Sequence, residues 1–582
     1  MVLELKMDYQ KAKNQYADAM GTGLEVMDLL GKRMPKPIIP VLLVAILRTR
    51  WRLYRFGIEK LVDHRPCYDP MAEASERIAL NLGNVTYVAK PEYNPLLTQH
   101  LIKGVLRNGL TEYSPFSIIS FGLVIIAALN DLHYGKRLAE VGLKVMARLK
   151  PGRWEGRTRF MYNTFIAQWF EPLRDVGKYQ EESYHLSVQS GDFEFASFAI
   201  LTGIFQQFIA GQPLTALKER ALLYQKVHRD TLGIPAKYDE FITIHLQPSL
   251  LTGDMEGLER WDGTPYDFDQ LEADFKENKN ELSLAGLYWT YMTVGLILNK
   301  VDEAWKHCEL HGEIGYSEAT VGWGQHMLFR CLIMMRRWDA YTTTEKRKNK
   351  RYLTQTIGRF KKWSKINSRN FHHKYCFLLA ERARLLGKTS KALEHYHEAL
   401  VSVAELQILH EMGMLHERVA SLHQEMGQTG AAQMHLREAH RVYQRWQSPV
   451  KLEEMEAAHP ELLNQAGTTL TQTQTSSGST PNLDLMSFIK SSQAISGELK
   501  LQQLLEKMLE VVMENSGAQR GLLLLYQQQQ LLVEGTIDYR DQSRQFGQSK
   551  PLAEHGDLAP TSLVYYVGRS GKEAALSDPH EL

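Results

Sequence analysis

The chain has 582 residues, of which 44% are hydrophobic, and its formal net charge is +1 at pH 7. This length allows several domains with sizeable cores, and the near-zero charge excludes a global attraction to nucleic acid or to an anionic membrane. The cysteines lack C-x-x-C spacing, which argues against a disulfide framework and against a structural zinc site; they are Cys67, Cys308, Cys331 and Cys376.

The N-terminal residues lack the apolar core of a signal peptide. The two longest apolar runs are Ile38–Leu47 and Ile118–Leu129. Both are shorter than the roughly 20 residues that cross a bilayer. We therefore expect two buried helices, no membrane contact and a cytoplasmic protein.

Apolar residues recur at spacings of three and four from residue 10 to about residue 460, which is typical of helices. Five short breaks share one pattern, in which a small residue follows the turn residue by five positions. The pairs are Asn130 and Gly135, Gly191 and Ala196, Asn299 and Ala304, Gly387 and Ala392, and Gly427 and Ala432. This pattern predicts the loop between the two helices of a degenerate tetratricopeptide-like unit.

The last two copies match at more positions. Gly387, Ala392, Tyr396 and Ala399 are followed forty residues later by Gly427, Ala432, Leu436 and Ala439. The glycine permits a tight turn, the first alanine a close helix approach, and the next two positions fill the groove on the same face.

Residues 1–460 are therefore predicted to form a mainly α, tetratricopeptide-like α-solenoid. Stacked repeats of this kind present an extended concave surface that binds peptides or other domains. The alternative is that the helices only space two functional domains apart.

Residues 461–482 lose the apolar periodicity and are rich in Thr, Gln and Ser, which predicts a flexible linker. The helix that follows has one apolar stripe that would cover a sheet, made of Leu501, Leu504, Leu505, Met508, Val511 and Val512. Gly521–Tyr526 predicts a buried strand and Leu531–Val533 a second one, joined by a turn at residues 527–530. Ser562–Val567 predicts a further helix or strand. A helix followed by a hairpin suits an antiparallel sheet with helices on one side.

The sequence from Asn482 onward resembles the opening of a GAF domain of bacterial sensor kinases. The residues that carry the resemblance are Ser491–Ser496, Leu504–Leu505 and Glu514–Gly521. Upstream, the chain resembles the end of the helical array that precedes such a domain, at Asn370–Phe371, His373–Lys374, Ala380–Arg384 and Tyr443–Trp446. The likeness extends further back through Asp69–Pro70, Tyr113–Pro115, Trp169–Leu173 and Ser190–Asp192. The chain thus resembles the middle of large bacterial signalling proteins that join a serine/threonine kinase, an AAA-type ATPase, a helical array, a GAF domain and a sensor histidine kinase.

The resemblance implies a partial α+β GAF domain at residues 483–582, with kinase and ATPase domains before residue 1 and a histidine kinase after residue 582. We therefore expect a fragment, a split gene product or a degenerate copy. Its function would be that of a non-catalytic sensory and scaffold polypeptide in bacterial two-component signal transduction. Its partners would be kinase or ATPase modules or a second copy. The alternative is a part of an active protein kinase whose catalytic domains lie outside the chain.

The GAF portion would hold a small ligand that the sequence does not identify, or would serve in dimerisation or signal relay. No cysteine follows Cys376, which excludes a thioether-linked bilin in this portion.

Several motif fragments predict no chemistry. Gly387-Lys388-Thr389 copies the end of a phosphate-binding loop, but Arg382 stands where the first glycine is required. His410-Glu411 and His416-Glu417 begin like a zinc-protease motif, but Met414 and Ala420 replace the second histidine of each.

His372, His373 and Cys376 lie one helical turn apart without a fourth ligand in the sequence nearby, which favours a surface or packing role. The chain has no kinase catalytic loop. We expect no catalytic, cofactor or metal site.

The strongest charge run comprises Lys346, Arg347, Lys348, Lys350, Arg351, Arg359, Lys361, Lys362 and Lys365, interleaved with Tyr352, Phe360 and Trp363. Cations beside aromatic rings can hold phosphates and stack bases, so a nucleic-acid-binding solenoid is a weaker alternative function. We favour the interpretation in which Phe360 and Trp363 are buried and the cations form the solvated face, because a similar patch would also dock an acidic partner and the chain has no net basicity.

Overall fold

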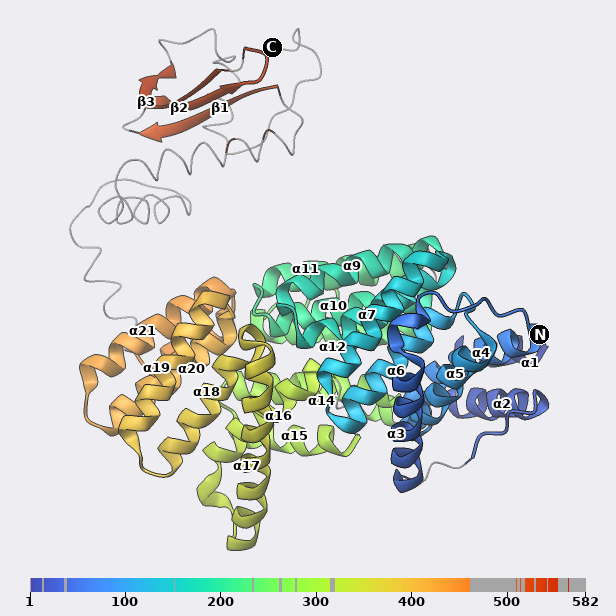
Figure 1. Ribbon diagram of the computed structural model, residues 1–582. Helices are drawn as coiled ribbons and strands as arrows, with labels where there is room; N and C mark the ends of the chain where they lie inside the picture. Colours follow the sequence, from blue (N-terminus) through green and yellow to red (C-terminus); the bar gives the residue numbers. More distant parts are fainter. Residues whose placement is uncertain are drawn as a thin grey trace. The chain divides into compact units, whose positions relative to one another are not determined.

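The computed structural model describes residues 2–460 except 13–14, 36–38, 151, 233–234, 261–263, 278–279 and 315–319, and then Leu509, Met513, residues 519–552 except 528–529 and 542, and Val564. The chain divides into two compact units, Met1–Thr469 and Leu470–Leu582 (Figure 1). The predicted linker at 461–482 lies outside the described residues.

The first unit is helical. Its first half contains α1 (Val2–Ala12), α2 (Tyr16–Leu29), α3 (Ile39–Phe56), α4 (Pro70–Ala89), α5 (Asn94–Asn108), α6 (Ser114–Leu129), α7 (Leu132–Leu149), α8 (Glu155–Phe165), α9 (Leu173–Gln189), α10 (Phe193–Ile209) and α11 (Leu214–Val227). Its second half contains α12 (Pro235–Thr252), α13 (Leu271–Glu277), α14 (Glu281–Ile297), α15 (Val301–Ile314), α16 (Val321–Arg336), α17 (Thr343–Ile366), α18 (Ser368–Leu385), α19 (Thr389–Leu406), α20 (Leu409–Glu425), α21 (Thr429–Trp446) and α22 (Pro449–Ala458).

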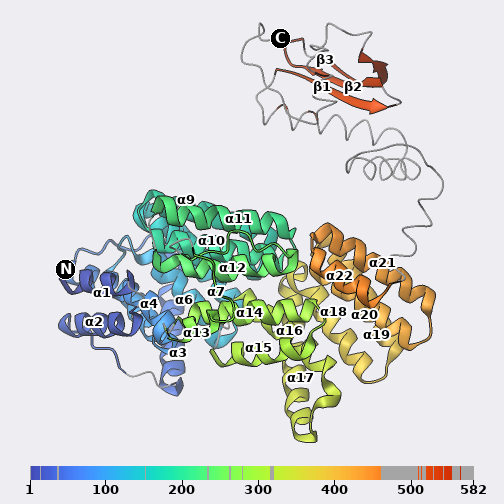
Figure 2. The same cartoon turned by 180° about the vertical axis from the view of Figure 1, so that it is seen from behind.

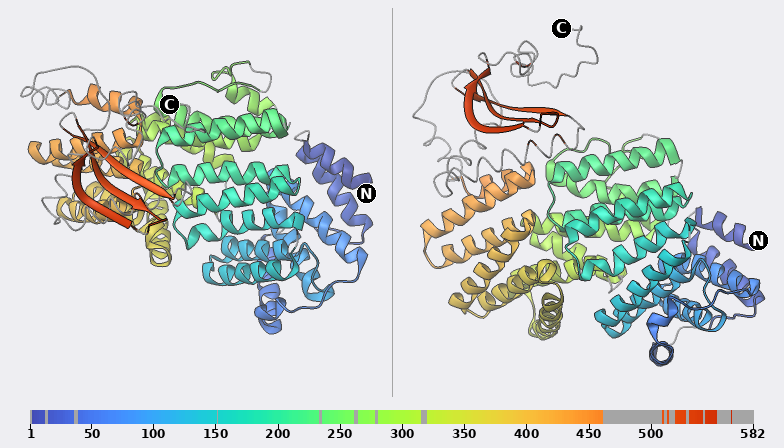
Figure 3. Two further views of the ribbon diagram at one scale, coloured as in Figure 1. Left: turned by 90° about the horizontal axis from the view of Figure 1, so that it is seen from above. Right: turned by 45° about the horizontal axis from the view of Figure 1, so that its top comes forward.

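The five predicted breaks are confirmed as turns between consecutive helices. They join α6 to α7, α9 to α10, α14 to α15, α18 to α19 and α20 to α21, and each of these pairs packs side by side along its length. In both views of Figure 3 the helices drawn in turquoise and green, which include α9 to α12, also run side by side. The first unit is therefore a repeat-like packing of helical hairpins.

Each of the five turn residues has left-handed backbone geometry, with φ between 51° at Asn130 and 72° at Gly191. In four of the turns the next residue donates its N–H to a carbonyl five residues back, as Lys388 does to Ala383 (2.9 Å) and Gln428 to His423 (2.8 Å). This bond satisfies a carbonyl that the helix end leaves open, and it requires the left-handed residue before it. Glycine and asparagine adopt that geometry at the lowest cost, which is why the pattern was visible in the sequence.

The small residue five positions after each turn is buried against the partner helix. Ala392, Ala432 and Ala304 are at most 1% exposed. At Gly135, a methyl group would lie 2.8 Å from the carbonyl oxygen of Gly122 on the facing helix. The remaining repeat positions are also buried: Tyr396, Ala399, Leu436 and Ala439.

Contacts also join hairpins that are far apart in the sequence, which the repeat pattern did not predict. Trp446 donates its indole N–H to the carbonyl of Gln212 (3.0 Å), and the Ser448 hydroxyl donates to that of Leu251 (2.9 Å). The ring of Trp446 lies 5.9 Å from that of Phe208. One continuous apolar core accordingly extends from Met7 to Met455. Hairpins separated by about 200 residues share this core because the helical stack folds back on itself, which local sequence patterns do not encode.

The two apolar runs differ in their surroundings. The run at Ile118–Leu129 lies within α6 and is buried, as predicted, as far as Ile126, whereas Ala127 and Ala128 are exposed. The described part of the run at Ile38–Leu47 begins with Ile39 at the start of α3, but Val41 and Leu47 are exposed, so the prediction of a buried helix is wrong there. Among the described helices, none has both the length and the apolar composition that crossing a bilayer requires.

The second unit contains an antiparallel sheet of order β1-β2-β3, formed by β1 (Arg520–Gln527), β2 (Gln530–Asp538) and β3 (Ser543–Pro551). Leu523 pairs with Gly535 and Leu524 with Val533, which leaves Glu534 as an extra residue in a bulge. Leu509 and Met513 pack on Ile537, Leu523 and Phe546. A second cluster joins Leu531, Val533 and Leu552 to Leu522, Leu524 and Val564.

The predicted hairpin is confirmed, with differences in detail. The side chains of Gly521–Leu525 are half-buried instead of buried, and the second strand continues to Asp538. The third strand was not predicted because Ser543–Pro551 has few apolar residues. All six residues of the stripe predicted within Leu501–Val512 lie outside the described residues, as does Ser562–Val567 except for Val564.

We predict opposite effects for two glycines three residues apart. Gly427→Ala forces a methyl group onto a left-handed residue (φ 71°) and should lower the free energy of unfolding by about 1–2 kcal/mol. Gly430 lies within α21 with no atom near its missing side chain, so Gly430→Ala should raise that free energy by about 0.5–1 kcal/mol. Urea denaturation followed by far-ultraviolet circular dichroism measures both, and two shifts of the same sign would contradict the turn geometry.

Candidate protein-interaction surface

The predicted charge run forms α17, a helix of 24 residues that spans about 36 Å. The helix begins at a capping box: the amide of Glu345 donates to the Thr342 hydroxyl (3.4 Å), and the Glu345 carboxylate accepts from the amide of Thr342 (2.8 Å). This cap satisfies two backbone donors and fixes the start of the helix. In Figure 1 and Figure 2, α17 reaches the lower edge of the helical unit.

Only the C-terminal half of α17 is anchored in the core. Its buried residues begin at Leu353 and include Phe360 and Trp363. The Trp363 ring lies 5.1 Å from that of Trp169, between ring centroids. The first nine residues of the helix, 343–351, therefore precede the part that packs against the core through Tyr352 and Leu353.

The cations of α17 point to solvent. We define its basic face as the exposed side chains of Arg347, Lys348, Lys350, Arg351, Lys361 and Lys362, whereas Lys346 is half-buried. Within the described part of the chain, none of these seven forms a salt bridge. Arg347, Arg351 and Lys362 recur at intervals of four and eleven residues, close to whole helical turns, so they share one side of the helix.

This arrangement is electrostatically unfavourable for the isolated helix. Arg347 and Arg351, like Lys361 and Lys365, are like charges four residues apart and repel each other. Lys346 and Arg347 also lie near the helix N-terminus, where the helix dipole disfavours positive charge. An anionic partner would relieve both repulsions.

The aromatic residues of α17 do not join the basic face. Phe360 and Trp363 are 0% and 4% exposed. Tyr352 is half-buried, with the Arg330 guanidinium 5.3 Å from its ring centroid. Burial also raises the pKa of Tyr352. No ring of α17 is therefore placed to stack with a base.

A second exposed face, which the sequence did not predict, lies on α3. We define the α3 face as Val41, Val44, Leu47, Trp51 and Tyr54; Trp51 is 57% and Tyr54 is 76% exposed. The opposite side of α3 is buried through Ile46 and Leu53. A continuous apolar run does not show which side of the helix a neighbouring element covers. The apolar composition of Ile38–Leu47 alone therefore suggested full burial.

Exposed arginines flank the α3 face at Arg48, Arg52 and Arg55. The Arg55 guanidinium lies 4.9 Å from the Trp51 ring. Trp, Tyr and Arg are the residues that contribute most to the centres of protein interfaces, and a contiguous exposed apolar patch is characteristic of such a surface.

The motif fragments have structural surroundings. Lys388 lies in the turn between Gly387 and the start of α19. A helix, α18, precedes this turn, whereas a phosphate-binding loop follows a strand. His410 and Glu411 are fully buried on α20. The Glu411 carboxylate meets His373 (2.9 Å) and the Lys374 ammonium, which also donates to Gln325 (2.7 Å). This network joins α16, α18 and α20 inside the core.

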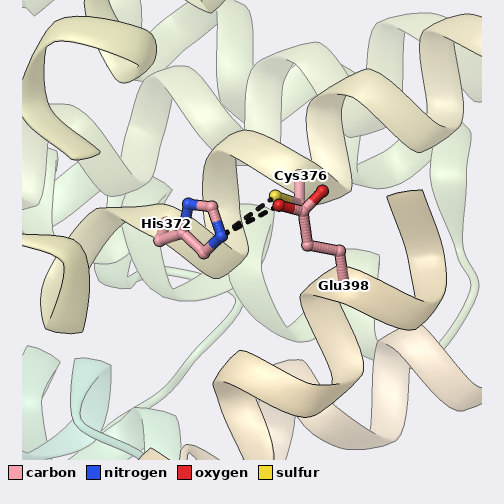
Figure 4. A group of neighbouring side chains, drawn as sticks. All are labelled: His372, Cys376 and Glu398. Carbon is pink, nitrogen blue, oxygen red and sulfur yellow. Dashed lines mark hydrogen bonds and ion pairs between the residues drawn. The ribbon is translucent and has the colours of Figure 1, made fainter. Parts of the chain in front are cut away.

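The other polar side of α18 meets α19. His372 Nε2 lies 3.2 Å from Glu398 Oε1 and 3.7 Å from Cys376 Sγ (Figure 4). Burial and the neighbouring Glu398 raise the pKa of Cys376 to about 12. His373, which the sequence grouped with His372 and Cys376, points into the core network instead, and Glu398 replaces it.

A small cavity lies among Arg336, Glu381, Glu417 and Arg418, with a volume of about 20 Å³. It has room for about one water molecule, whereas small-molecule sites enclose several hundred Å³. This cavity is too small for a metabolite.

No protein-family model matches the chain, and no curated protein matches it. Among solved structures, a "circular tandem repeat protein with novel repeat topology and enhanced subunit contact surfaces" is 14% identical, covering 81% of this chain and 89% of that chain, with a TM-score of 0.13. A score this low does not establish a shared fold.

We predict that the two sides of α3 respond differently to truncation. Leu47→Ser combined with Trp51→Ser removes exposed groups and should change the free energy of unfolding by at most about 0.5 kcal/mol. Leu53→Ala removes a buried side chain and should cost about 2–5 kcal/mol. Urea denaturation of both variants is the measurement, and a large loss in the double variant would mean that the α3 face is covered within the chain.

Proposed function

We propose that this chain is a non-catalytic scaffold in bacterial signal transduction. In this proposal the first unit is a tetratricopeptide-like α-solenoid that holds protein partners in the cytoplasm. The second unit is a partial GAF domain that relays a signal in a two-component system. The resemblance to multidomain kinases supports the signalling context, and the hairpin packing supports the scaffold role.

The observation that carries the proposal is the basic face of α17. Its cations are exposed, lack salt bridges among the described residues and stand on a helix anchored at one end. Because the helix is already formed, its backbone loses little freedom when a partner binds, although the exposed Lys and Arg side chains still lose rotamer freedom. Complementary charge also steers and orients a protein partner. We therefore infer that the partner segment is acidic.

A protein partner accounts for this surface better than nucleic acid does. Proteins that hold single-stranded nucleic acid combine a basic groove with exposed stacking rings. The rings of Phe360 and Trp363 are buried, and Tyr352 is half-covered by Arg330. The basic face offers charge without stacking, which fits carboxylate side chains.

The α3 face supplies a second contact of a different kind. Its apolar centre and flanking arginines fit a helix with an apolar side and acidic edges. Two faces of distinct chemistry on one helical unit allow two partners to be held at once, which is what a scaffold does.

We predict that the full chain binds a fluorescent peptide of alternating Glu and Ala, and that its affinity falls as salt rises. Arg347→Ser, Arg351→Ser and Lys362→Ser together should weaken binding by roughly tenfold, because three favourable charge contacts are lost. Fluorescence anisotropy at several salt concentrations measures the dissociation constants.

The matched control is Lys32→Ser, Lys60→Ser and Lys388→Ser, which removes the same charge from exposed positions elsewhere. Equal weakening by both triple variants would show attraction to overall charge and would contradict a specific basic face. Tighter binding of an oligothymidine of equal charge would favour the nucleic-acid alternative. Saturable ATP binding by the chain would contradict the non-catalytic proposal itself.

A further inference from the structure

The hairpin of α18 and α19 brings together three side chains with metal-binding atoms. His372 and Cys376 are four residues apart on α18, so they lie on one face of that helix. Glu398 reaches the same point from α19, as Figure 4 shows. The ligand atoms of all three lie within 4.8 Å of one another.

The spacing of these atoms matches a tetrahedral zinc shell. With Zn–N and Zn–O near 2.0 Å and Zn–S near 2.3 Å, tetrahedral angles place N and O about 3.3 Å apart and N and S about 3.5 Å apart. The observed separations are 3.2 Å from His372 Nε2 to Glu398 Oε1 and 3.7 Å from His372 Nε2 to Cys376 Sγ. One cation at the centre would need little movement of the two helices.

The ligand types select the metal. Calcium and magnesium prefer shells made only of oxygen, whereas thiolate and imidazole favour zinc and its chemical neighbours. A thiolate and a carboxylate together carry two negative charges, which a divalent cation neutralises. The bound site would then be electrically neutral, which lowers the cost of placing it beside the buried Cys376.

The surroundings favour both rigidity and access. Tyr396 and Ala399, on either side of Glu398 along α19, are fully buried and fix that helix against α18. The Glu398 side chain itself is 49% exposed, so a hydrated cation can reach the site from solvent. Among the described residues, the Nδ1 atom of His395 has no hydrogen-bond partner, and it lies 3.7 Å from the second oxygen of Glu398. It is placed to orient that carboxylate.

We propose that His372, Cys376 and Glu398 form a zinc site that clamps α18 to α19. Binding joins Zn²⁺ to the imidazole nitrogen, the carboxylate oxygen and the sulfur, and the thiol proton leaves to solvent. Three protein ligands leave one position for water. The metal would tie together the hairpin that contains the clearest repeat.

Cobalt(II) is the probe because it occupies zinc sites and gives a near-ultraviolet absorption band when bound to a thiolate. Titration of the full chain should show one equivalent bound, with this band, and zinc should displace the cobalt. Cys376→Ser should abolish the band. Glu398→Gln and His372→Gln should each weaken cobalt binding by at least about tenfold.

Two controls separate the site from adventitious ligands. His397→Gln changes the exposed neighbour of Glu398, and Cys67→Ser changes a cysteine that is not buried; both should bind cobalt like the unmodified chain. Glu398→Gln alters an exposed side chain, so its thermal melting without metal should match that of the unmodified chain. Zinc should raise the melting temperature of the unmodified chain and should do so less in this variant.

The proposal is overturned if the unmodified chain gives no saturable thiolate band, or if the band survives Cys376→Ser. It is also overturned if His397→Gln weakens binding as much as His372→Gln does. In these cases the three side chains would form only an ion pair and a weak thiol contact between the helices.

Discussion

The buried side chain of Asn370 is the contact on which the arrangement of the helical unit most depends. Its amide nitrogen donates to the carbonyls of Gln168 (2.9 Å) and Glu171 (2.8 Å), and its oxygen accepts from the amide of Leu173 (3.2 Å). One side chain thus satisfies three backbone groups about 200 residues away. The Glu171 carbonyl also accepts from the Asn367 side chain (3.2 Å), so two neighbouring asparagines hold this segment. Loss of a bond to a buried backbone group costs more than the bond itself contributes. These long-range hydrogen bonds hold hairpins that are distant in the sequence together in one unit.

That body gives α18 three different environments. His373 and Lys374 face the core, where Glu411 is held ionised: burial raises its pKa, but Lys374 and His373 lower it well below its ordinary value. Two turns further along, Glu381 pairs with Arg418 and accepts from the Tyr396 hydroxyl. His372 and Cys376 lie on the side toward α19. A buried pair of charges is weak evidence for stability, but it fixes register, because any slip would leave a charge unpaired.

The sequence predicted what local chemistry determines. The turns at Gly387 and Gly427 were predictable because a left-handed residue followed by a small one leaves a direct mark in the residue types. The first hairpin of the sheet was predictable because the apolar run Gly521–Tyr526 is followed by a polar turn and a second apolar run. The exposure of Trp51 and the closeness of Glu398 to His372 were not, because both depend on how elements distant in sequence come together. GAF identity and the α-solenoid's signalling role stay proposals that rest on resemblance and surface chemistry.

The charges of α17 disfavour the isolated helix but would favour the binding of an acidic partner. A helix that repels itself and opposes its own dipole persists because the capping box fixes one end and Phe360 and Trp363 bury the other. Those anchors would hold the helix equally well with neutral residues at Arg347 and Arg351. Nothing in the packing of the described residues therefore requires these charges. They form a solvated face, and the acidic protein segment proposed above would bind it without needing the aromatic rings that the core has already taken.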